Sequence, residues 1–245
     1  MEKVALVTGA SRGIGAATAL RLANDGCAVA VNYRRSSSEA EAVVKRIESL
    51  GRRAIALQAD VGDPAEARQL VERAAAELGG LNILVNNAGY SQHADLEGLK
   101  LGDWERMIQV GLTGAFVCAQ AAVPYMKKAS WGRIVNIASL RAMTGSDHGA
   151  HYASAKAGII GLTKSLALEL AKHKITVNAV SPGYTRTEMT REALEKHGVE
   201  IAKKIPLGRP AEPEEIAAVV AVLASEEASY ITGETINVNG GIYMR

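Results

Sequence analysis

Aromatic residues, cysteine and proline are all scarce in this sequence of 245 residues. Phe, Trp and Tyr together make up 4% of it, and it contains six prolines and two cysteines. Cys27 and Cys118 lie in apolar stretches, which favours buried free thiols in a reducing compartment over a disulfide framework. No Pro/Gly/Ser-rich linker divides the chain and no internal repeat occurs, so we expect one domain spanning residues 1–245.

An excess of one charge is also lacking. The chain has 28 basic and 26 acidic residues, which gives a net charge of +2, and the charges are scattered. No basic stripe favours nucleic acid as a partner. No apolar run reaches about 18 residues, and the opening MEKVALVTGA lacks the features of a secretory signal. We therefore expect a soluble, cytoplasmic protein with no membrane or nucleic-acid partner and no metal site.

What the sequence does contain is an alternation of short β-branched runs and helical patterns. Several runs are apolar almost throughout, which is typical of parallel strands covered on both faces. Strand, helix and strand in repeated succession predict right-handed crossovers. We therefore predict an α/β fold, a Rossmann-like doubly wound parallel sheet of about seven strands. The expected strands are 3–8, 28–32, 54–58, 81–87, 133–139, 175–181 and 235–240, and the expected helices are 13–25, 38–50, 64–79, 102–128, 151–171 and 213–224.

Segment 184–211 interrupts this alternation. It follows Pro182-Gly183 and is rich in Thr, Glu, Lys and Arg. A long surface insertion beside a strand end is often a lid over a site, so we expect a lid here. An ordinary exposed helical excursion is the alternative.

A glycine-rich turn joins the first expected strand to the first expected helix. Gly9, Gly13 and Gly15 have the spacing GxxxGxG. Glycines at such a turn let the backbone approach a pyrophosphate, whose charge is favoured at a helix N-terminus. The pattern therefore indicates a dinucleotide site, although a glycine-rich turn can also serve tight packing alone.

The end of the second strand indicates which dinucleotide is bound. Folds specific for NAD usually place an acidic residue here to hold the ribose 2′-hydroxyl. This chain has Asn32-Tyr33-Arg34-Arg35-Ser36 instead, without a carboxylate. Arginine matches the geometry of a phosphate, and Arg12 in the glycine turn can reach the same region. We therefore predict NADP(H) rather than NAD(H), with a solvated pair of surface charges as the alternative.

Ser139, Tyr152 and Lys156 form the candidate reaction centre. Tyr152 and Lys156 are four residues apart, so they project from one helix face, and Ser139 ends the fifth expected strand. A free tyrosine titrates near 10, and a neighbouring ammonium favours the phenolate and lowers that pKa. A serine at a strand end can donate a hydrogen bond to a developing alkoxide. Taken alone, a Tyr–Lys pair is a weak signal, because such pairs decorate many helices.

Several motifs in register resemble the short-chain dehydrogenase/reductase family over nearly the whole chain. Within it, the chain is similar to the 3-oxoacyl-[acyl-carrier-protein] reductase branch or the related glucose dehydrogenases. The family resemblance implies seven strands in the order 3-2-1-4-5-6-7, with the site at their carboxyl ends. It also implies a homotetramer built on helices 112–123 and 151–171, which are rich in small residues. The motifs are TGASRGIG (8–15), Asp60-Val61, NNAG (86–89), Ser139, YASAK (152–156), PGYTRT (182–187) and NVNGG (237–241).

The resemblance also assigns roles. It implies that Tyr152 is the general acid in reduction, that Lys156 lowers the pKa of Tyr152 and holds the nicotinamide ribose, and that Ser139 orients the substrate oxygen. Asp60 and Val61 would border the adenine. The full set of expected NADP(H) contacts is Gly9, Ser11, Arg12, Gly13, Ile14, Gly15, Asn32, Tyr33, Arg34, Asp60, Val61, Asn87, Ala88, Gly89, Tyr152, Lys156, Pro182, Gly183 and Thr187.

One position departs from the family pattern. Gly111, in the stretch VGLTG, stands where the family has a fourth catalytic residue, an asparagine. This leaves open whether the proton relay behind Lys156 is impaired. Because glycine leaves room for water and lets a helix bend, we expect a locally bent helix and a hydrated pocket beside Lys156.

The expected function is NADPH-dependent reduction of a ketone, in particular of a 3-oxoacyl thioester. Two alternatives stay open: a dehydrogenase of sugars or other secondary alcohols, since the chemistry is reversible, and a catalytically impaired NADP-binding sensor or scaffold. Arg141 is placed to attract an anionic substrate group or to form a solvent-facing salt bridge. The candidate substrate-pocket residues are Gln92, Arg141, His148, His151, Tyr184 and Met189.

Overall fold

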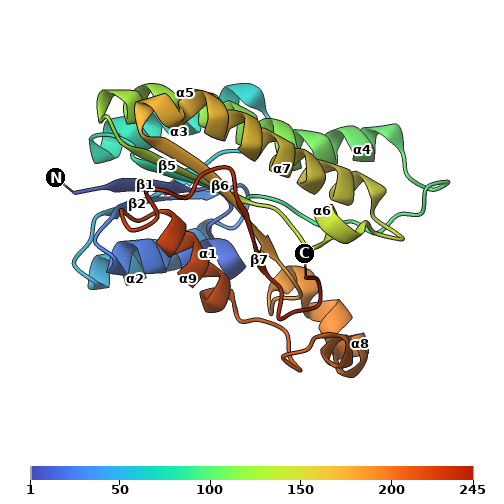
Figure 1. Ribbon diagram of the computed structural model, residues 1–245. Coiled ribbons are helices and arrows are strands. Elements are labelled where there is room, and N and C mark those ends of the chain that lie inside the picture. The colour runs from blue at the N-terminus through green and yellow to red at the C-terminus, as the bar shows by residue number, and fades with distance from the viewer. Residues whose placement is uncertain (1, 245) are drawn as a thin grey trace.

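The computed structural model describes residues 2–244 and is built around one sheet of seven parallel strands (Figure 1). The strand order is β3-β2-β1-β4-β5-β6-β7, as the family resemblance implied, and the α/β prediction is confirmed. The strands are β1 (Val4–Val7), β2 (Ala28–Tyr33), β3 (Ala54–Gln58), β4 (Ile83–Asn86), β5 (Gly132–Ile137), β6 (Ile175–Pro182) and β7 (Thr235–Val238).

Alternate residues of the central strands pack against opposite faces of the sheet. In β1, Val4 and Leu6 belong to one hydrophobic core, and Ala5 and Val7 belong to the other. Successive side chains of a strand point to opposite faces, so a strand that is apolar throughout must be covered on both. All four β1 residues are at most 3% exposed. The apolar runs therefore predicted buried parallel strands correctly.

Helices cover both faces of the sheet. One core is completed by α3 (Pro64–Leu78), α5 (Gly114–Lys128) and α7 (Ala150–Leu170), and the other by α1 (Gly13–Asn24), α2 (Ser37–Ser49) and α9 (Pro213–Leu223). Figure 1 shows these two layers on opposite sides of the strands. The doubly wound arrangement is therefore confirmed.

The helix expected at 102–128 is interrupted. After α4 (Leu101–Ile108), the chain forms a five-residue π-helical turn, η1 (Gln109–Thr113), before it continues as α5. The whole span Leu101–Lys128 is long and apolar enough to cross a membrane, but 56% of its most apolar window is buried inside the protein. Since α5 packs against α3 and η1 packs against α7, this span is a core helix of the fold.

Segment 184–211 folds into two helical pieces that stand apart from the two layers. These are the 3₁₀ turn η3 (Glu188–Thr190) and α8 (Arg191–Lys204), which lies beyond the end of the sheet in Figure 1. Two further short elements are α6 (Arg141–Thr144), directly after β5, and the 3₁₀ turn η2 (Ala171–His173), directly after α7. The alternation of apolar and polar residues did not predict η3, α6 or η2, which are three or four residues long and have no buried residue. It did not predict α8 either, in which Ile201 is the buried residue.

Both cysteines are buried and free, as expected from their apolar surroundings. Burial raises the pKa of the Cys27 thiol to about 11 and that of the Cys118 thiol to about 12. The thiols are therefore protonated at neutral pH, because burial outweighs the effect of Lys3 and Arg52, which lower the pKa of Cys27.

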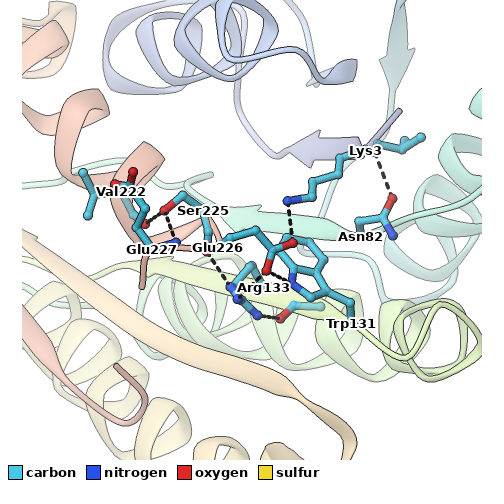
Figure 2. Close-up of polar contacts among 10 residues, drawn as sticks. Lys3, Asn82, Trp131, Arg133, Val222, Ser225, Glu226 and Glu227 are labelled. Carbon is cyan, nitrogen blue, oxygen red and sulfur yellow. Dashed lines mark hydrogen bonds and ion pairs between the residues drawn. The ribbon is translucent and has the colours of Figure 1, made fainter. Parts of the chain in front are cut away.

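A polar cluster joins three segments at the amino ends of β1 and β5 (Figure 2). The Trp131 ring has the Lys3 ammonium 4.0 Å from its centroid and the Arg133 guanidinium carbon at 4.3 Å. Glu226 accepts hydrogen bonds from Lys3 Nζ (3.0 Å) and from Trp131 Nε1 (2.9 Å). The Arg133 guanidinium, only 2% exposed, donates to the backbone carbonyl of Ser225 (3.0 Å). The cluster therefore ties the loop after α9 to the sheet.

We expect Arg133→Ala to lower the free energy of unfolding by about 2–4 kcal/mol, because it opens a cavity and leaves buried carbonyls without a donor. Urea denaturation measures the change. Arg68→Ala is the matched control, since Arg68 is an exposed arginine whose one hydrogen bond is to Gln120. Equal effects of the two substitutions would contradict a stabilising role for the cluster.

Candidate active site

A cleft with a volume of about 1200 Å³ lies at the carboxyl ends of the strands, the end of the sheet at which α6 and α8 also lie (Figure 1). Parallel strands place ligands at this edge. Of the residues expected in the reaction centre or in contact with the coenzyme, nine line this cleft: Ile14, Asn87, Gly89, Ser139, Tyr152, Lys156, Pro182, Gly183 and Thr187. The fold thus brings together motifs from five separate parts of the chain.

Ser139, Tyr152 and Lys156 lie in this cleft as expected. Ser139 follows β5, and its Oγ accepts a hydrogen bond from the Arg141 backbone N–H (3.1 Å). Tyr152 and Lys156 are one turn apart on α7, with Lys156 Nζ 6.0 Å from the centroid of the Tyr152 ring. Lys156 Nζ also donates to the carbonyl of Ile137 at the end of β5 (2.6 Å), which fixes α7 against the sheet.

Burial dominates the electrostatics of these groups. It raises the pKa of Tyr152, while the Ser139 hydroxyl and the Arg141 guanidinium lower it in part. Burial also lowers the pKa of Lys156 to about 8. The sequence led us to expect Lys156 as the cation that lowers the pKa of Tyr152, but in this structure that cation is Arg141. The role of Lys156 toward Tyr152 stays a prediction.

The glycine turn has the backbone conformation that a dinucleotide site needs. Gly9 and Gly13 have φ angles of +61° and +57°, which favour glycine. A Cβ at Gly15 would collide with the carbonyl oxygen of Gly9, and one at Gly13 would press on Thr187 at 3.3 Å. The glycines therefore let the turn pack closely against neighbouring segments at the start of α1, in a conformation that a residue with a Cβ could not adopt without strain.

The NNAG motif holds this turn in place. Asn87 Nδ2 donates to the carbonyls of Thr8 (2.9 Å) and Gly9 (3.0 Å). In return, the Thr8 hydroxyl accepts from the backbone N–H groups of Asn87 and Ala88, each at 3.0 Å. The loop after β4 is thereby hydrogen-bonded to the loop after β1, across two neighbouring strands.

Asn32 supports the turn from β2. Its Oδ1 accepts from the Gly9 N–H (3.0 Å), and its Nδ2 donates to the carbonyls of Leu57 and Ala59 (3.2 and 3.1 Å). Asn32 is 2% exposed, and its hydrogen bonds connect the glycine turn to the end of β3. Its neighbour Tyr33 is half-buried and packs on the α1–α2–α9 core.

Arg12 and Arg34 line two separate depressions. Arg34 lies beside Asp60, 3.6 Å from its carboxylate, in a depression that Arg35 and Arg106 also line. Arg12 lies 3.7 Å from Glu188 in a depression that Gly13 and Thr187 share. The side chains of both arginines are about half exposed, 58% for Arg12 and 42% for Arg34, so each can turn toward a ligand.

Arg106 is a site residue that sequence reasoning missed. It comes from α4 and donates a short hydrogen bond to Asp60. Burial alone would raise the pKa of Asp60, but the Gly62 N–H, Arg106 and Arg34 together lower it. Asp60 is therefore ionised and held between two arginines. No pattern in the sequence marks Arg106, because it lies 46 positions away from Asp60.

Gly111 lies in the π-helical turn η1, so the helix is locally rewound at this position, and the expected bend stays a prediction. A Cβ at Gly111 would lie 3.1 Å from the Cβ of Ala155, next to Lys156 on α7. A cavity of about 10 Å³ adjoins Gly111, Lys156 and Asn86, and Val61 and Ala88 also line it. That volume is about the minimum for one water molecule, and the buried Asn86 Oδ1 has no hydrogen-bond partner among residues 2–244. The cavity is where we expected one, and its hydration stays a prediction.

The candidate substrate-pocket residues line the cleft with one exception. Gln92, Arg141, His148, Tyr184 and Met189 all line it. His151 does not: it is fully buried, and Asp103 at the start of α4 is the charged group that acts on its pKa, so the prediction for His151 was wrong. One residue before Tyr152 on a helix, its side chain points about 100° away from that of Tyr152. Segment 184–211 adds α8 to the cleft wall through Ala193, His197, Glu200, Ile201 and Lys204.

Known proteins resemble this chain along its whole length. The family model described as enoyl-(acyl carrier protein) reductase matches residues 9–243. A 3-oxoacyl-[acyl-carrier-protein] reductase of Staphylococcus aureus is 46% identical over 244 residues, which cover 100% of this chain and 99% of the relative. An acetoin dehydrogenase of Salmonella typhimurium superposes with a TM-score of 0.91 at 38% identity, covering 99% of this chain and 96% of that one. A blue fluorescent protein from a metagenomic library, in complex with NADPH, superposes with a TM-score of 0.92 at 40% identity, covering 99% and 98%.

Proposed function

This chain belongs to the short-chain dehydrogenase/reductase family of oxidoreductases, and from that premise we propose that it reduces the ketone of a 3-oxoacyl thioester with NADPH. The observation that carries the proposal is the convergence of Ser139, Tyr152 and Lys156 on one cleft beside the glycine turn. A full-length relative that carries the name of a 3-oxoacyl reductase supports the choice of substrate class.

The residues around the turn fit a bound dinucleotide. The turn with Gly9, Gly13 and Gly15 would hold the pyrophosphate at the start of α1, where backbone N–H groups favour an anion. Arg34 and Arg12 would hold the 2′-phosphate. The remaining contacts would come from Ser11, Ile14, Asp60, Val61, Asn87, Ala88, Gly89, Pro182, Gly183 and Thr187. When bound, the coenzyme supplies the hydride.

Tyr152 would donate the proton that the carbonyl oxygen takes up. Because burial raises its pKa, the phenol is protonated at neutral pH, which is the form that a general acid needs. The Ser139 Oγ accepts the Arg141 N–H, so its own O–H is available to donate to the substrate oxygen. Lys156, with a pKa of about 8, is still mainly an ammonium at neutral pH and would donate to the nicotinamide ribose hydroxyls.

Two features outside the reaction centre complete the proposal. Segment 184–211 would act as a lid, since α8 already forms one wall of the cleft. A cytoplasmic homotetramer would use α5 and α7, on which Phe116 is 44% and Leu168 is 85% exposed. Closed assemblies of this kind are symmetric and cover such apolar side chains.

Coenzyme oxidation with a panel of carbonyl substrates tests the proposed function. We expect the enzyme to oxidise NADPH when an acetoacetyl thioester is supplied. The loss of NADPH absorbance measures this reaction. Reduction of acetoin alone, or reduction of NADP⁺ by a sugar or other secondary alcohol, would favour the alternative of an alcohol dehydrogenase, which the resemblance to an acetoin dehydrogenase supports. NADPH binding without turnover of any substrate would favour a sensor or scaffold.

Arg34→Ser is expected to erode the preference for NADPH over NADH, chiefly through KM. Losing a charge-assisted contact to the 2′-phosphate costs about 1.5–3 kcal/mol, or roughly a ten- to hundredfold loss of preference. The coenzyme preference of Arg12→Ser, measured separately, shows whether the depression that Arg12 shares with Gly13 and Thr187 also contributes. Arg53→Ser is the control. Arg53 precedes β3, so it lies at the amino ends of the strands, whereas Arg34 lies at their carboxyl ends, and it pairs with Glu2. Equal kcat/KM for the two coenzymes in the unmodified enzyme would contradict this role of Arg34.

A further inference from the structure

Arg141 is the arginine that lines the described wall of the cleft, and no carboxylate in residues 2–244 lies within ion-pair distance of it. At the rim of the cleft Asp147 pairs with His148 at 2.7 Å, and in the neighbouring depression Glu188 pairs with Arg12 and Arg191. The guanidinium of Arg141 instead donates to the hydroxyl of Tyr184 (3.3 Å). The sequence left a solvent-facing salt bridge open for Arg141, and the structure contains none in its described part.

Hydrogen bonds of both the backbone and the side chain hold Arg141 in place beside the candidate reaction centre. Its backbone N–H donates to Ser139 Oγ, and its side chain is held at Tyr184. The half-buried guanidinium lies in the same cleft as Tyr152 and is near enough to lower the pKa of that phenol. Arg141 therefore presents its charge next to the place where a ketone oxygen would meet Ser139 and Tyr152.

Most of the hydrogen-bonding capacity of this guanidinium is unused. An arginine has five N–H donors in a planar fork, and one hydrogen bond to Tyr184 leaves the others without a partner among the described residues. A half-buried cation of this kind favours an oxygen acceptor, and a charge-assisted bond is about twice as strong as a neutral one. The feature thus points to a ligand group with an oxygen close to the reacting carbonyl.

We propose that Arg141 is a specificity residue that binds a second oxygen of the substrate, two carbons away from the ketone. This inference rests on the proposed ketone reduction and narrows it to 1,3-dicarbonyl substrates. In a 3-oxoacyl thioester the second oxygen is the thioester carbonyl, and in a 3-oxo acid it is the carboxylate. A site that is built to hydrogen-bond a substrate oxygen discriminates against analogues without one, because its own donors are then left unpaired.

The test compares Arg141→Met with the unmodified enzyme on three substrates. Acetoacetyl-N-acetylcysteamine carries a thioester carbonyl, acetoacetate carries a carboxylate, and trifluoroacetone is an activated ketone without a second oxygen. We expect the ratio of kcat/KM for the thioester to that for trifluoroacetone to fall about ten- to hundredfold, mainly through KM. The ratio cancels any effect that Arg141 has on Tyr152, which acts on all three substrates alike.

Two further variants sharpen the test. Arg141→Lys keeps the charge and is expected to recover part of the ratio, while Tyr184→Phe, which removes the anchor of the guanidinium, is expected to lower it less than Arg141→Met does. Arg73→Met is the matched control, because Arg73 is an exposed arginine on α3 that pairs with Glu77, away from the cleft. It is expected to leave the ratio within about twofold of the unmodified enzyme.

If Arg141→Met leaves the ratio to trifluoroacetone unchanged for both acetoacetyl substrates, which includes an equal loss on all three substrates, the inference is overturned. A fall in the ratio for acetoacetate but not for the thioester assigns the carboxylate as the group that Arg141 binds. Failure of the proposed function is a separate result: the unmodified enzyme would then turn over neither acetoacetyl substrate, whatever stands at position 141.

Discussion

Tyr152→Phe is expected to lower kcat for ketone reduction by about 10²–10⁴-fold, the range in which a positioned general acid contributes to catalysis. Phenylalanine fills the same space but has no proton to donate. Tyr152 and Tyr184 are the two tyrosines on the described cleft wall, and Tyr152 is the one on α7, one turn before Lys156. Stopped-flow or steady-state measurement of NADPH oxidation gives kcat, and coenzyme fluorescence shows whether NADPH still binds.

The pH dependence adds a second readout for Tyr152. Because burial raises its pKa, the phenol carries its proton at neutral pH, and reduction should decline only as the pH rises through this raised value. The reverse reaction needs the phenolate and should increase over the same range. Tyr230→Phe is the control, since Tyr230 is fully exposed after α9. Near-normal turnover by Tyr152→Phe would show that the proton comes from another group.

Ser139→Ala is expected to lower kcat by about 10²–10³-fold, corresponding to about 2.7–4 kcal/mol for the loss of one hydrogen-bond donor to a developing oxyanion. Ser139 is 8% exposed at the end of β5, and its Oγ already accepts the Arg141 N–H. The hydroxyl proton is therefore directed away from that N–H and is available to the substrate.

Two comparisons make the serine prediction sharper. Ser146→Ala removes a hydroxyl from the wall of the same cleft and should change kcat by less than about threefold. Residues that act as a unit are non-additive, so Ser139→Ala combined with Tyr152→Phe should be little slower than Tyr152→Phe alone. A purely additive double variant would indicate that the two residues act in separate steps.

The fold was predictable because its signals are local. Each central strand is an apolar run with both faces buried, as β1 illustrates, and proline marks helix starts at Pro64 and Pro213. In α3, the side chain of Asp63 accepts from the N–H groups of Ala65 and Glu66. Such features need no knowledge of distant contacts, and the alternation of strands and helices then restricts the topology.

Parts of the site could not be predicted, because they depend on contacts between distant segments. The pairing of Arg106 with Asp60 joins α4 to the loop after β3, and nothing near Arg106 in the sequence marks it. The sequence led us to expect Asn32 as a coenzyme contact but did not reveal its hydrogen bonds to the backbone of the glycine turn and of residues 57–59. The prediction that His151 lines the substrate pocket was wrong for a similar reason, since α4 covers that part of α7.

Gly111 shows the limit of an argument from pattern alone. The sequence identified the departure from the family and suggested a bend, but it did not predict the π-helical turn that brings Gly111 against Ala155. Such turns are frequent at functional sites, and this one borders the cavity beside Lys156. The distance between α7 and this turn depends on how the two helices pack in the fold. Comparing one residue with the family pattern gives no information about that packing.

The central claim is that this protein transfers a hydride from NADPH to a ketone carbon. The most direct measurement supplies NADPH with deuterium at both C4 positions of the nicotinamide, together with an acetoacetyl thioester in ordinary water. We predict that the 3-hydroxyacyl product carries one deuterium, on the carbinol carbon, and that the hydroxyl hydrogen comes from solvent. Product formation with no deuterium at that carbon would contradict the account.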